Sequence, residues 1–376
     1  MMTILAAVFT ISLILYSCTL LLFILGLFRQ KEHRYHNRPF VSVIIPAKNE
    51  KDHIENILYD VTHQTYPKDK YEIIIVDDES TDVTPNICNA YVEKYQNVKL
   101  LSTNSWDSSL RYKKKPLDLG IKNAAGEILL FTDADCHVLS TWIETMVSYF
   151  TPEVGLVIGY SELVPYHTLL EKIQTIDFFM LMNAARGCTQ LGLPFACTGQ
   201  NLAYRKKAFE EVGGFSSFAD SVGGDDTLFL QQIKKKTSWN ISFAINPGAY
   251  VSSSPTQILN QLLTQRIRWA ADSLSIKHTD PLFFSIIITT FLANLTPLLL
   301  MISLIFSGSL FLLLLKGLLI KFIMEAMLMM KGTSTFQRQE IRSIFPAWFF
   351  FQIPYVVTMG FISLLGNRFP WGGRFN

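Results

Sequence analysis

Two carboxylates follow an apolar run in the segment LLFTDADCHV, residues Leu129–Val138, where Asp133 and Asp135 stand two positions apart. An Asp-x-Asp triplet alone is weak evidence, because aspartates are common in turns. The same spacing suits a hard divalent cation such as Mg²⁺ or Mn²⁺, which is often held by one or two carboxylates plus substrate phosphates. The cation would offset the repulsion between the two charges. The other polar motifs decide between a simple turn and a metal site.

Strands that could position these aspartates are visible as short, nearly continuous β-branched runs, the pattern typical of strands covered on both faces. They are VSVIIP at 41–46, YEIIIVDD at 71–78, NVKLLS at 97–102 and EILLFTD at 127–133. Residues 50–63 carry a helical pattern, and a second helix is expected from Thr81 with Ser80 as its N-cap. This alternation predicts an α/β fold with a mostly parallel central sheet, whose ligands bind beyond the carboxyl ends of the strands. Four aspartates are expected at that edge: Asp77, Asp78, Asp133 and Asp135.

Two further segments place charged or aromatic side chains on helices. In GGDDTLFLQQI a Gly-rich turn opens a helix with Asp225 and Asp226 in its first turn, where they could serve only as caps. In QRIRW, Gln265, Arg268 and Trp269 are three and four positions apart and can share one helix face. Arginine suits a pyrophosphate by bidentate hydrogen bonding, and tryptophan can stack on a sugar or a base. The alternative is a basic, aromatic helix beside a bilayer.

Three long uncharged runs predict that the chain crosses a membrane, since a span needs ~20 apolar residues. They are Ile4–Phe28, Leu282–Leu315 and Ile344–Gly366. The first and last fit one span each, and the middle run fits part of a helical hairpin. Basic residues follow the first run, so we expect a signal anchor with everything after it in the cytoplasm. The predicted domains are an N-terminal transmembrane anchor at 1–30, a cytoplasmic domain at 39–272 and a C-terminal membrane region of about three spans at 281–366.

Charges inside the C-terminal region leave its topology open. Lys321 and Glu325 stand four positions apart, and they lie within the bilayer if a helix spans about Gly308–Met330, the interpretation that we favour. Alternatively the hairpin turns near Thr296-Pro297, and the charged segment lies along the cytoplasmic interface. In either case one last span follows and places the tail at 367–376 outside, against the preference of its two arginines.

Composition narrows the partners and the compartment. A net charge of +2 implies no general attraction to nucleic acid. Five scattered cysteines without a CxxC pair fit a reducing compartment and no metal–thiolate cluster. We therefore expect an integral protein of the cell inner membrane, with its catalytic domain in the cytoplasm and the lipid bilayer as one partner.

Six motifs occur along the chain in a recognisable order: VSVIIPAKNE, IIIVDDESTD, KKKPLDLGIKNAAGE, LLFTDADC, GGDDTLFL and QRIRW. Together they resemble the membrane-anchored family-2 glycosyltransferases, the inverting group of GT-A fold that includes ceramide glucosyltransferase and the cellulose, chitin and hyaluronan synthases. The resemblance covers Val41 to about Ala271. It implies a GT-A-type nucleotide-sugar-binding domain flanked by transmembrane helices.

The resemblance also implies roles for residues at matching positions. The nucleotide-sugar pocket would be lined by Ala47, Glu50, Asp77, Asp78, Lys113 and Asp133. Asp77 is the first choice for the base or ribose, and Lys113 for the diphosphate. The neighbouring lysines, Lys114 or Lys115, could take the place of Lys113, and the whole run could simply be solvated. Asp133 and Asp135 would hold Mg²⁺ or Mn²⁺, with Asp135 the more direct ligand.

The catalytic base implied by the resemblance is Asp226. Asp225 stands where the family usually has glutamate, which leaves open which of the two is the base. A carboxylate beside another can have its pKa raised toward a value useful to a general base. The diphosphate and the acceptor would be contacted by Gln265, Arg266, Arg268, Trp269, Thr198, Gly199 and Gln200. For the last three, a purely structural strand is an equal alternative.

The function implied is inverting transfer of a hexose from a nucleotide-sugar, expected to be UDP-linked, to a lipid or lipid-linked glycan presented by the membrane. A processive polysaccharide synthase is the alternative within the class, and few spans for a translocation channel favour single transfer. A non-catalytic membrane receptor on the same fold is a third possibility. A nucleotidyltransferase would share the aspartates but would have no use for QRIRW beside a membrane.

Overall fold

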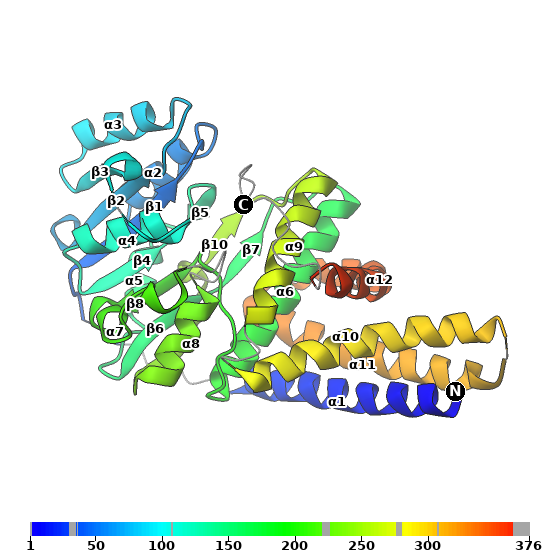
Figure 1. Ribbon diagram of the computed structural model, residues 1–376. Coiled ribbons are helices and arrows are strands. Elements are labelled where there is room, and N and C mark those ends of the chain that lie inside the picture. Colours follow the sequence, from blue (N-terminus) through cyan, green and yellow to red (C-terminus); the bar gives the residue numbers. More distant parts are fainter. Residues whose placement is uncertain are drawn as a thin grey trace. The chain divides into compact units, whose positions relative to one another are not determined.

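The computed structural model describes residues 2–29, 35, 37–106, 108–219, 226–275, 280–306 and 308–363. The chain forms two compact units, which are described separately below (Figure 1). The sheet unit comprises residues 30–165 and 192–255, and the helical unit comprises residues 1–29, 166–191 and 256–376. The predicted domain ranges remain a prediction, although residues 166–191, inside the predicted cytoplasmic domain, group with the apolar helices.

A seven-stranded sheet in the order β3-β2-β1-β4-β8-β6-β9 forms the centre of the sheet unit. Its strands are β1 Val41–Ala47, β2 Tyr71–Asp77, β3 Val98–Ser102, β4 Ile128–Phe131, β6 Val154–Gly159, β8 Leu202–Arg205 and β9 Asn240–Ala244. Strands β3, β2, β1 and β4 are parallel, β6 is parallel to β9, and only β8 runs antiparallel to its neighbours. The predicted α/β fold with a mostly parallel sheet is confirmed. A small second sheet joins β5 Cys136–Val138, β10 Val251–Ser253 and β7 Ser161–Leu163.

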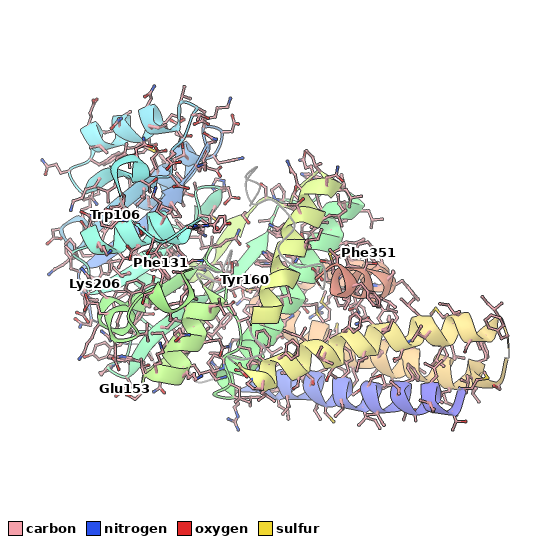
Figure 2. All side chains as sticks on the ribbon, in the orientation of Figure 1. Trp106, Phe131, Glu153, Tyr160, Lys206 and Phe351 are labelled. Atoms are coloured by element: carbon pink, nitrogen blue, oxygen red, sulfur yellow. The ribbon has the colours of Figure 1, made fainter. Side chains whose placement is uncertain are left out.

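Helices cover this sheet, and the predicted strands are buried on both faces. The helices of the sheet unit are α2 Ile54–Thr62, α3 Thr84–Lys94, α4 Lys114–Asn123, α5 Trp142–Val147, α7 Lys206–Glu211 and α8 Thr227–Lys236. Strand β1 shows the effect, since Val43, Ile44 and Ile45 are all fully buried. Side chains fill the space between the sheet and its helices, as around the labelled Phe131 (Figure 2). The helix expected from Thr81 begins later, at Thr84, because the Ser80 hydroxyl accepts a hydrogen bond from Asn49 instead.

A buried carboxylate ties together the amino ends of the first strands. Glu72 is 4% exposed, and its Oε1 accepts hydrogen bonds from the Ser42 hydroxyl and the Ala125 amide, both at 2.6 Å. Its Oε2 accepts a bond of 2.7 Å from Lys99 Nζ. Burial raises the pKa of Glu72, but the hydrogen bonds from Lys99, Ser42 and Ala125 outweigh it and lower the pKa overall. The charged form therefore stabilises the fold.

We expect Glu72→Ala to destabilise the protein by about 2–4 kcal/mol, because two buried donors lose their acceptor. The thermal midpoint of the detergent-solubilised chain should fall by several degrees, and Glu93→Ala on the exposed part of α3 should leave it unchanged. Since the folded pKa lies below the unfolded value of 4.5, this stabilisation is present above pH 4.5 and is lost as the pH falls through the folded pKa. Glu72→Gln should therefore flatten the loss of stability in acid. An equal acid response in both proteins would contradict this role.

The helical unit consists of long helices, most of them apolar. They are α1 Met2–Phe28, α6 Leu169–Gln190, α9 Leu259–Ser275, α10 Pro281–Leu304, α11 Phe311–Phe336 and α12 Phe345–Ser363. By length and composition, three helical segments within the described residues could cross a membrane: Met2–Phe28, Pro281–Leu304 and Gln339–Ile362. The break between α10 and α11 lies where the favoured interpretation placed it, whereas Pro297 of the alternative turn lies inside α10.

Close backbone contacts and a buried ion pair hold these helices together. A Cβ atom on Gly26 of α1 would lie 1.9 Å from the carbonyl oxygen of Gly187 in α6, so only glycine permits this crossing. Lys321 and Glu325, both in α11 and at most 1% exposed, pair at 2.6 Å. Glu325 also accepts hydrogen bonds from Tyr16 of α1 at 2.6 Å and Gln352 of α12 at 2.5 Å. The charges predicted to lie within the bilayer are thus satisfied inside the protein.

Candidate active site

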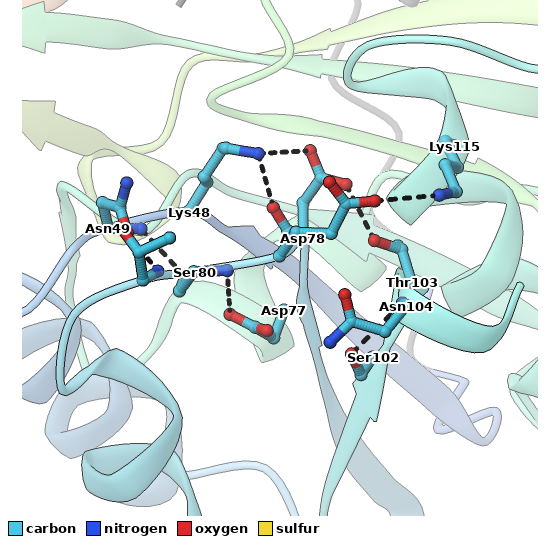
Figure 3. A network of polar contacts seen from close by, with 11 residues as sticks. Lys48, Asn49, Asp77, Asp78, Ser80, Ser102, Thr103, Asn104 and Lys115 are labelled. Carbon is cyan, nitrogen blue, oxygen red and sulfur yellow. Dashed lines mark hydrogen bonds and ion pairs between the residues drawn. The ribbon is translucent and has the colours of Figure 1, made fainter.

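The loops after β1 and β2 are joined by polar contacts at the carboxyl edge of the sheet (Figure 3). The Asp78 amide donates to the Ala47 carbonyl at 2.8 Å, and Lys48 Nζ donates to the Asp78 carbonyl at 2.7 Å. Asp78 Oδ1 accepts a bond of 2.9 Å from the Thr103 hydroxyl, and Asp77 Oδ1 accepts one of 3.3 Å from the Ser80 amide. Both aspartates are nearly buried. These contacts shape the loops rather than cap a helix.

A different aspartate at this edge accepts a hydrogen bond from the start of the next helix. Asp82 Oδ1 accepts a hydrogen bond of 2.9 Å from the amide of Thr84, the first residue of α3. Asn49 in the β1 loop has a φ of 56°, and its side-chain oxygen accepts a bond of 2.8 Å from the Thr81 amide. The two loops therefore have fixed conformations, and Asp77 and Asp78 are left at the strand end, where a ligand is expected in this type of sheet.

Three carboxyl groups lie close together near the end of β4. Desolvation by burial raises the pKa of Glu50 to about 7, and the negative charges of Asp135 and Asp133 add to the rise. Desolvation also raises the pKa of Asp135, with Asp133 adding and Lys113 opposing, although this side chain keeps contact with solvent. Mutual repulsion of this kind marks a place where a cation would be stabilised.

The residues present fit a divalent cation that is shared with a substrate. Within the described part of the chain, no group of three His, Cys, Asp or Glu side chains forms a complete metal-binding set. Asp133 and Asp135 would therefore supply part of the coordination only, with phosphate oxygens supplying more, as is common for Mg²⁺ and its relatives. The carboxylate oxygens of Asp133 and Asp135 are the kind of ligand that a hard cation prefers.

A lysine at the start of α4 contacts this acidic group. Lys113 Nζ lies 2.5 Å from Asp133 Oδ1, whereas Lys115 pairs with Glu79 at 3.3 Å. Helix α4 lies close against β1 because Gly120 faces Ile44, where a Cβ atom would come within 2.7 Å of the Ile44 Cγ2. Lys113 is thus directed at the predicted metal motif, whereas Lys115 is directed at Glu79. The contact favours Lys113 over Lys115 for the diphosphate role.

Asp226 is held in place by two backbone amides. It is the N-cap of α8, where its Oδ1 accepts from the Thr227 amide at 2.5 Å. Its Oδ2 accepts from the amide of Gly199 at 2.9 Å, a residue of the predicted acceptor segment. Beside it, Gln200 Nε2 donates to the Ser253 hydroxyl at 3.1 Å, and its amide bonds the Thr198 hydroxyl. Asp226 does cap a helix, but its bond from the Gly199 amide also joins it to the loop before β8. Asp225 lies outside the described residues.

One pocket in the sheet unit brings several of these residues together. Its lining includes Lys113, Asp133, Gly199 and Asp226, with Pro46 and Leu117 among the apolar residues. The lining residues come from five separate parts of the chain: β1, the start of α4, the end of β4, β8 with the turn before it, and the start of α8. A carboxylate suited to accept a proton and a cationic group suited to a diphosphate therefore line the same hollow.

Some residues of this edge were missed from the sequence. Lys48 and Thr103 fix the Asp78 loop, and Thr132 lines the pocket beside Asp133. Lys48 stands inside the quoted motif VSVIIPAKNE, which was the available signal. Nothing in the local sequence marked Thr103, because it meets Asp78 only when β2 and β3 pair in register.

The QRIRW segment belongs to α9 of the helical unit. Gln265 is exposed, whereas Arg266 is 4% exposed and its Nη2 lies 3.1 Å from Asp177 Oδ2 of α6. The Trp269 ring lies 4.3 Å from the Arg266 guanidinium carbon and also meets Phe178. Arg266 is thus occupied inside its own unit. The Arg268 side chain lies outside the described part, and the roles predicted for this segment remain predictions.

Comparison with known proteins places the chain among sugar-transferring enzymes. The family model described as "Glycosyl transferase family 21" matches residues 2–375. The curated glycosyltransferase AglE of Haloferax volcanii is 28% identical over 260 residues, which are 66% of this chain and 81% of that protein. The beta-monoglucosyldiacylglycerol synthase of Nostoc sp. is 28% identical over 62% of this chain and 48% of its own length, so this chain spans about half of that relative.

A solved structure shows the same fold over nearly the whole chain. The mannosyltransferase PcManGT from Pyrobaculum calidifontis, solved in complex with GDP-Man and Mn²⁺, superposes with a TM-score of 0.65 at 20% identity. The match covers 96% of this chain and 99% of that one. The expected GT-A-type fold is confirmed.

Proposed function

The chain belongs to glycosyl transferase family 21 and is a glycosyltransferase, and from this premise we propose that it moves a hexose from a UDP-sugar to a lipid acceptor at the membrane surface. The observation that carries the proposal is the shared pocket, in which Asp226, Lys113 and Asp133 line one hollow. The Nostoc relative is named as a synthase of beta-monoglucosyldiacylglycerol, a glucosylated lipid, and this name supports a lipid acceptor. The apolar helices support an integral membrane protein. We place the sheet unit in the cytoplasm, at the inner membrane of the cell, because basic residues follow the first apolar run.

In the proposed reaction, Asp226 removes the proton of an acceptor hydroxyl. The oxygen forms a bond to the anomeric carbon on the face opposite the diphosphate, the bond from that carbon to the diphosphate breaks, and the diphosphate leaves with the electron pair. This single displacement inverts the configuration. Two backbone amides, those of Gly199 and Thr227, keep the Asp226 carboxylate in position. Precise positioning of a general base accounts for part of the rate enhancement of such a step.

The remaining residues bind the donor and stabilise the departing charge. Asp77 and Asp78 occupy the strand end, where they contact the base and ribose, and Lys113 neutralises the diphosphate. Asp133 and Asp135 would hold a divalent cation, which would supply electrostatic stabilisation of the leaving diphosphate. The Mn²⁺ in the mannosyltransferase complex supports this assignment. Single transfer is proposed over processive synthesis, because only three helical segments among the described residues are candidate membrane spans from which to build a channel.

The test is a donor panel with the purified full-length chain in detergent, Mn²⁺ or Mg²⁺ and total membrane lipid as acceptor. We expect consumption of one UDP-hexose and a lipid product carrying one sugar. GDP-mannose belongs in the panel, and its exclusive use would overturn the UDP assignment. A ladder of oligomers would favour the processive alternative. Asp226→Asn serves as the blank for spontaneous donor hydrolysis.

A further inference from the structure

The helices of the helical unit differ in direction. Helices α1 and α11 run in the same direction, because contacts between them advance together along both chains: Phe9 meets Gly317, Tyr16 bonds Glu325 and Phe28 lies under Lys331. Helix α10 runs in the opposite direction. The hydroxyls of Thr296 in α10 and Ser12 in α1 lie 3.3 Å apart, so these two residues have the same position along the bundle axis. These three helices form a bundle of parallel and antiparallel members, seen side-on in Figure 1.

Helix α12 touches this bundle at one level only. At its start, the rings of Phe345 and Phe349 each lie 5.1 Å from the ring of Phe322 in α11. Near its end, Phe361 meets Phe291 of α10 at 5.6 Å. Phe291 is five residues from Thr296, about 7.5 Å along the bundle, which brings it level with Glu325 in α11. The two ends of α12 therefore lie at nearly the same height.

This placement excludes an arrangement of α12 along the bundle axis. From Phe349 to Phe361 the helix advances 12 residues, about 18 Å at 1.5 Å per residue. An aligned helix would have carried Phe361 to one end of the bundle, whereas it stays at the middle. Figure 1 agrees, since α12 is viewed almost end-on while α1, α10 and α11 extend across the picture. Length and apolar composition alone would have made α12 a span.

We propose that α12 does not cross the bilayer but lies in its plane, entering from the face at which α1 and α11 end. The inference rests on the proposed membrane placement of the helical unit. The exposed side of α12 would then contact the lipid acyl chains on that side of the membrane. This side carries Phe350 and Phe361, which are 68% and 54% exposed. The chain after α12 then remains on the side of the membrane at which α1 ends.

Charge supports the same side for the end of the chain. Residues 364–376 lie outside the described part, but their sequence contains Arg368 and Arg374 and no acidic residue. From the level of α12, reaching the opposite face would carry both arginines through the far half of the bilayer, which is costly. Basic segments also favour the cytoplasmic face. We therefore place this tail on the side at which α1 ends, in place of the outside location expected from the sequence.

Depth measurement by spin labelling tests the proposal directly. Cys18 and Cys197, the cysteines that are not buried, are replaced, and nitroxides are placed singly at Phe350→Cys and Phe361→Cys of the full chain in lipid vesicles. Oxygen and nickel-chelate accessibility should report nearly equal depths for the two labels. On a spanning helix these positions, 11 residues apart, would differ by about 16 Å. A difference of that size overturns the proposal.

A matched control uses Ile4→Cys and Leu15→Cys on α1, which are also exposed and 11 residues apart. These labels should differ by about 16 Å in depth. If neither α1 label contacts lipid, the membrane placement and this proposal both fail. Sugar transfer by the labelled chains is measured separately, so an inactive protein with the expected depths would count against the proposed function alone.

The side of the chain end is read with reporters on the full-length protein. Green fluorescent protein fused after Asn376 should fluoresce and alkaline phosphatase at the same place should be inactive, while phosphatase fused before Met1 with an export signal should be active. Active phosphatase at the C-terminus would overturn the in-plane assignment of α12.

Discussion

Replacing Asp226 by asparagine is expected to lower kcat for sugar transfer by about 10³-fold, because a general base contributes roughly 10²–10⁴ to such a step. Asparagine keeps the size of the side chain and also caps helices well, so α8 should remain intact. The thermal midpoint should therefore stay near that of the wild type. The measurement is transfer of radiolabelled sugar at saturating donor, together with donor affinity by calorimetry, which should change little.

The matched control is the same substitution at another helix N-cap. Asp280 caps α10 through a bond of 3.0 Å to the Phe283 amide, and Asp280→Asn should retain activity within a few fold. Asp225→Asn tests which of the two adjacent carboxylates, Asp225 or Asp226, is the catalytic base. If Asp225→Asn abolishes transfer and Asp226→Asn does not, the assignment of the base is wrong.

Most of the sheet unit could be predicted from the sequence because its signals are local. Continuous apolar runs such as Ile73–Val76 leave little alternative to a strand buried on both faces, and parallel connectivity then brings strand ends to one edge. The clustering of Glu50, Asp133 and Asp135 follows from that rule. Their electrostatic coupling confirms that they are close, although the catalytic roles themselves stay predictions.

What could not be predicted depends on contacts between distant segments. The role of Arg266 at a diphosphate stays a prediction, but its pairing with Asp177, a residue 89 positions earlier on a helix without a clear sequence pattern, could not be foreseen. Helix α6 carries polar residues that are buried against other helices, so its periodicity is blurred. The direction of α12 is likewise set by ring contacts to α10 and α11 rather than by its own composition.

The division into units has the same origin. Residues 166–191 read as part of a cytoplasmic domain because nothing in their composition separates them from it. They join the helical unit through close packing of Gly187 on Phe23 and of Asn183 on Gly332, where a Cβ on either glycine would clash. Each of these contacts needs a glycine packed against a residue far away in the chain. No local sequence pattern indicates such a pair.

Asp135→Asn is expected to weaken Mn²⁺ binding in the presence of UDP by at least about 100-fold and to reduce transfer by a similar factor, because a metal ion contributes several kcal/mol of charge stabilisation in such sites. Asp135 is chosen over Asp133 because Asp133 already bonds Lys113, so its substitution would also release the lysine. Mn²⁺ binding is followed by electron paramagnetic resonance, which reports free ion independently of turnover.

Asp82→Asn is the matched control for this change, since Asp82 lies at the same sheet edge and contributes to the raised pKa of Glu50, but its carboxylate accepts hydrogen bonds from the Thr84 and Lys51 amides. Its Mn²⁺ affinity should stay within a few fold of the wild type. The Asp135 substitution also removes one of the charges that raise the pKa of Glu50, so the residual Mn²⁺ binding should depend less on pH between 6 and 8. Equal Mn²⁺ affinity in Asp135→Asn and the wild type would exclude Asp135 as a ligand, and Asp133 would then be the only carboxylate of the Asp-x-Asp motif left to hold the cation.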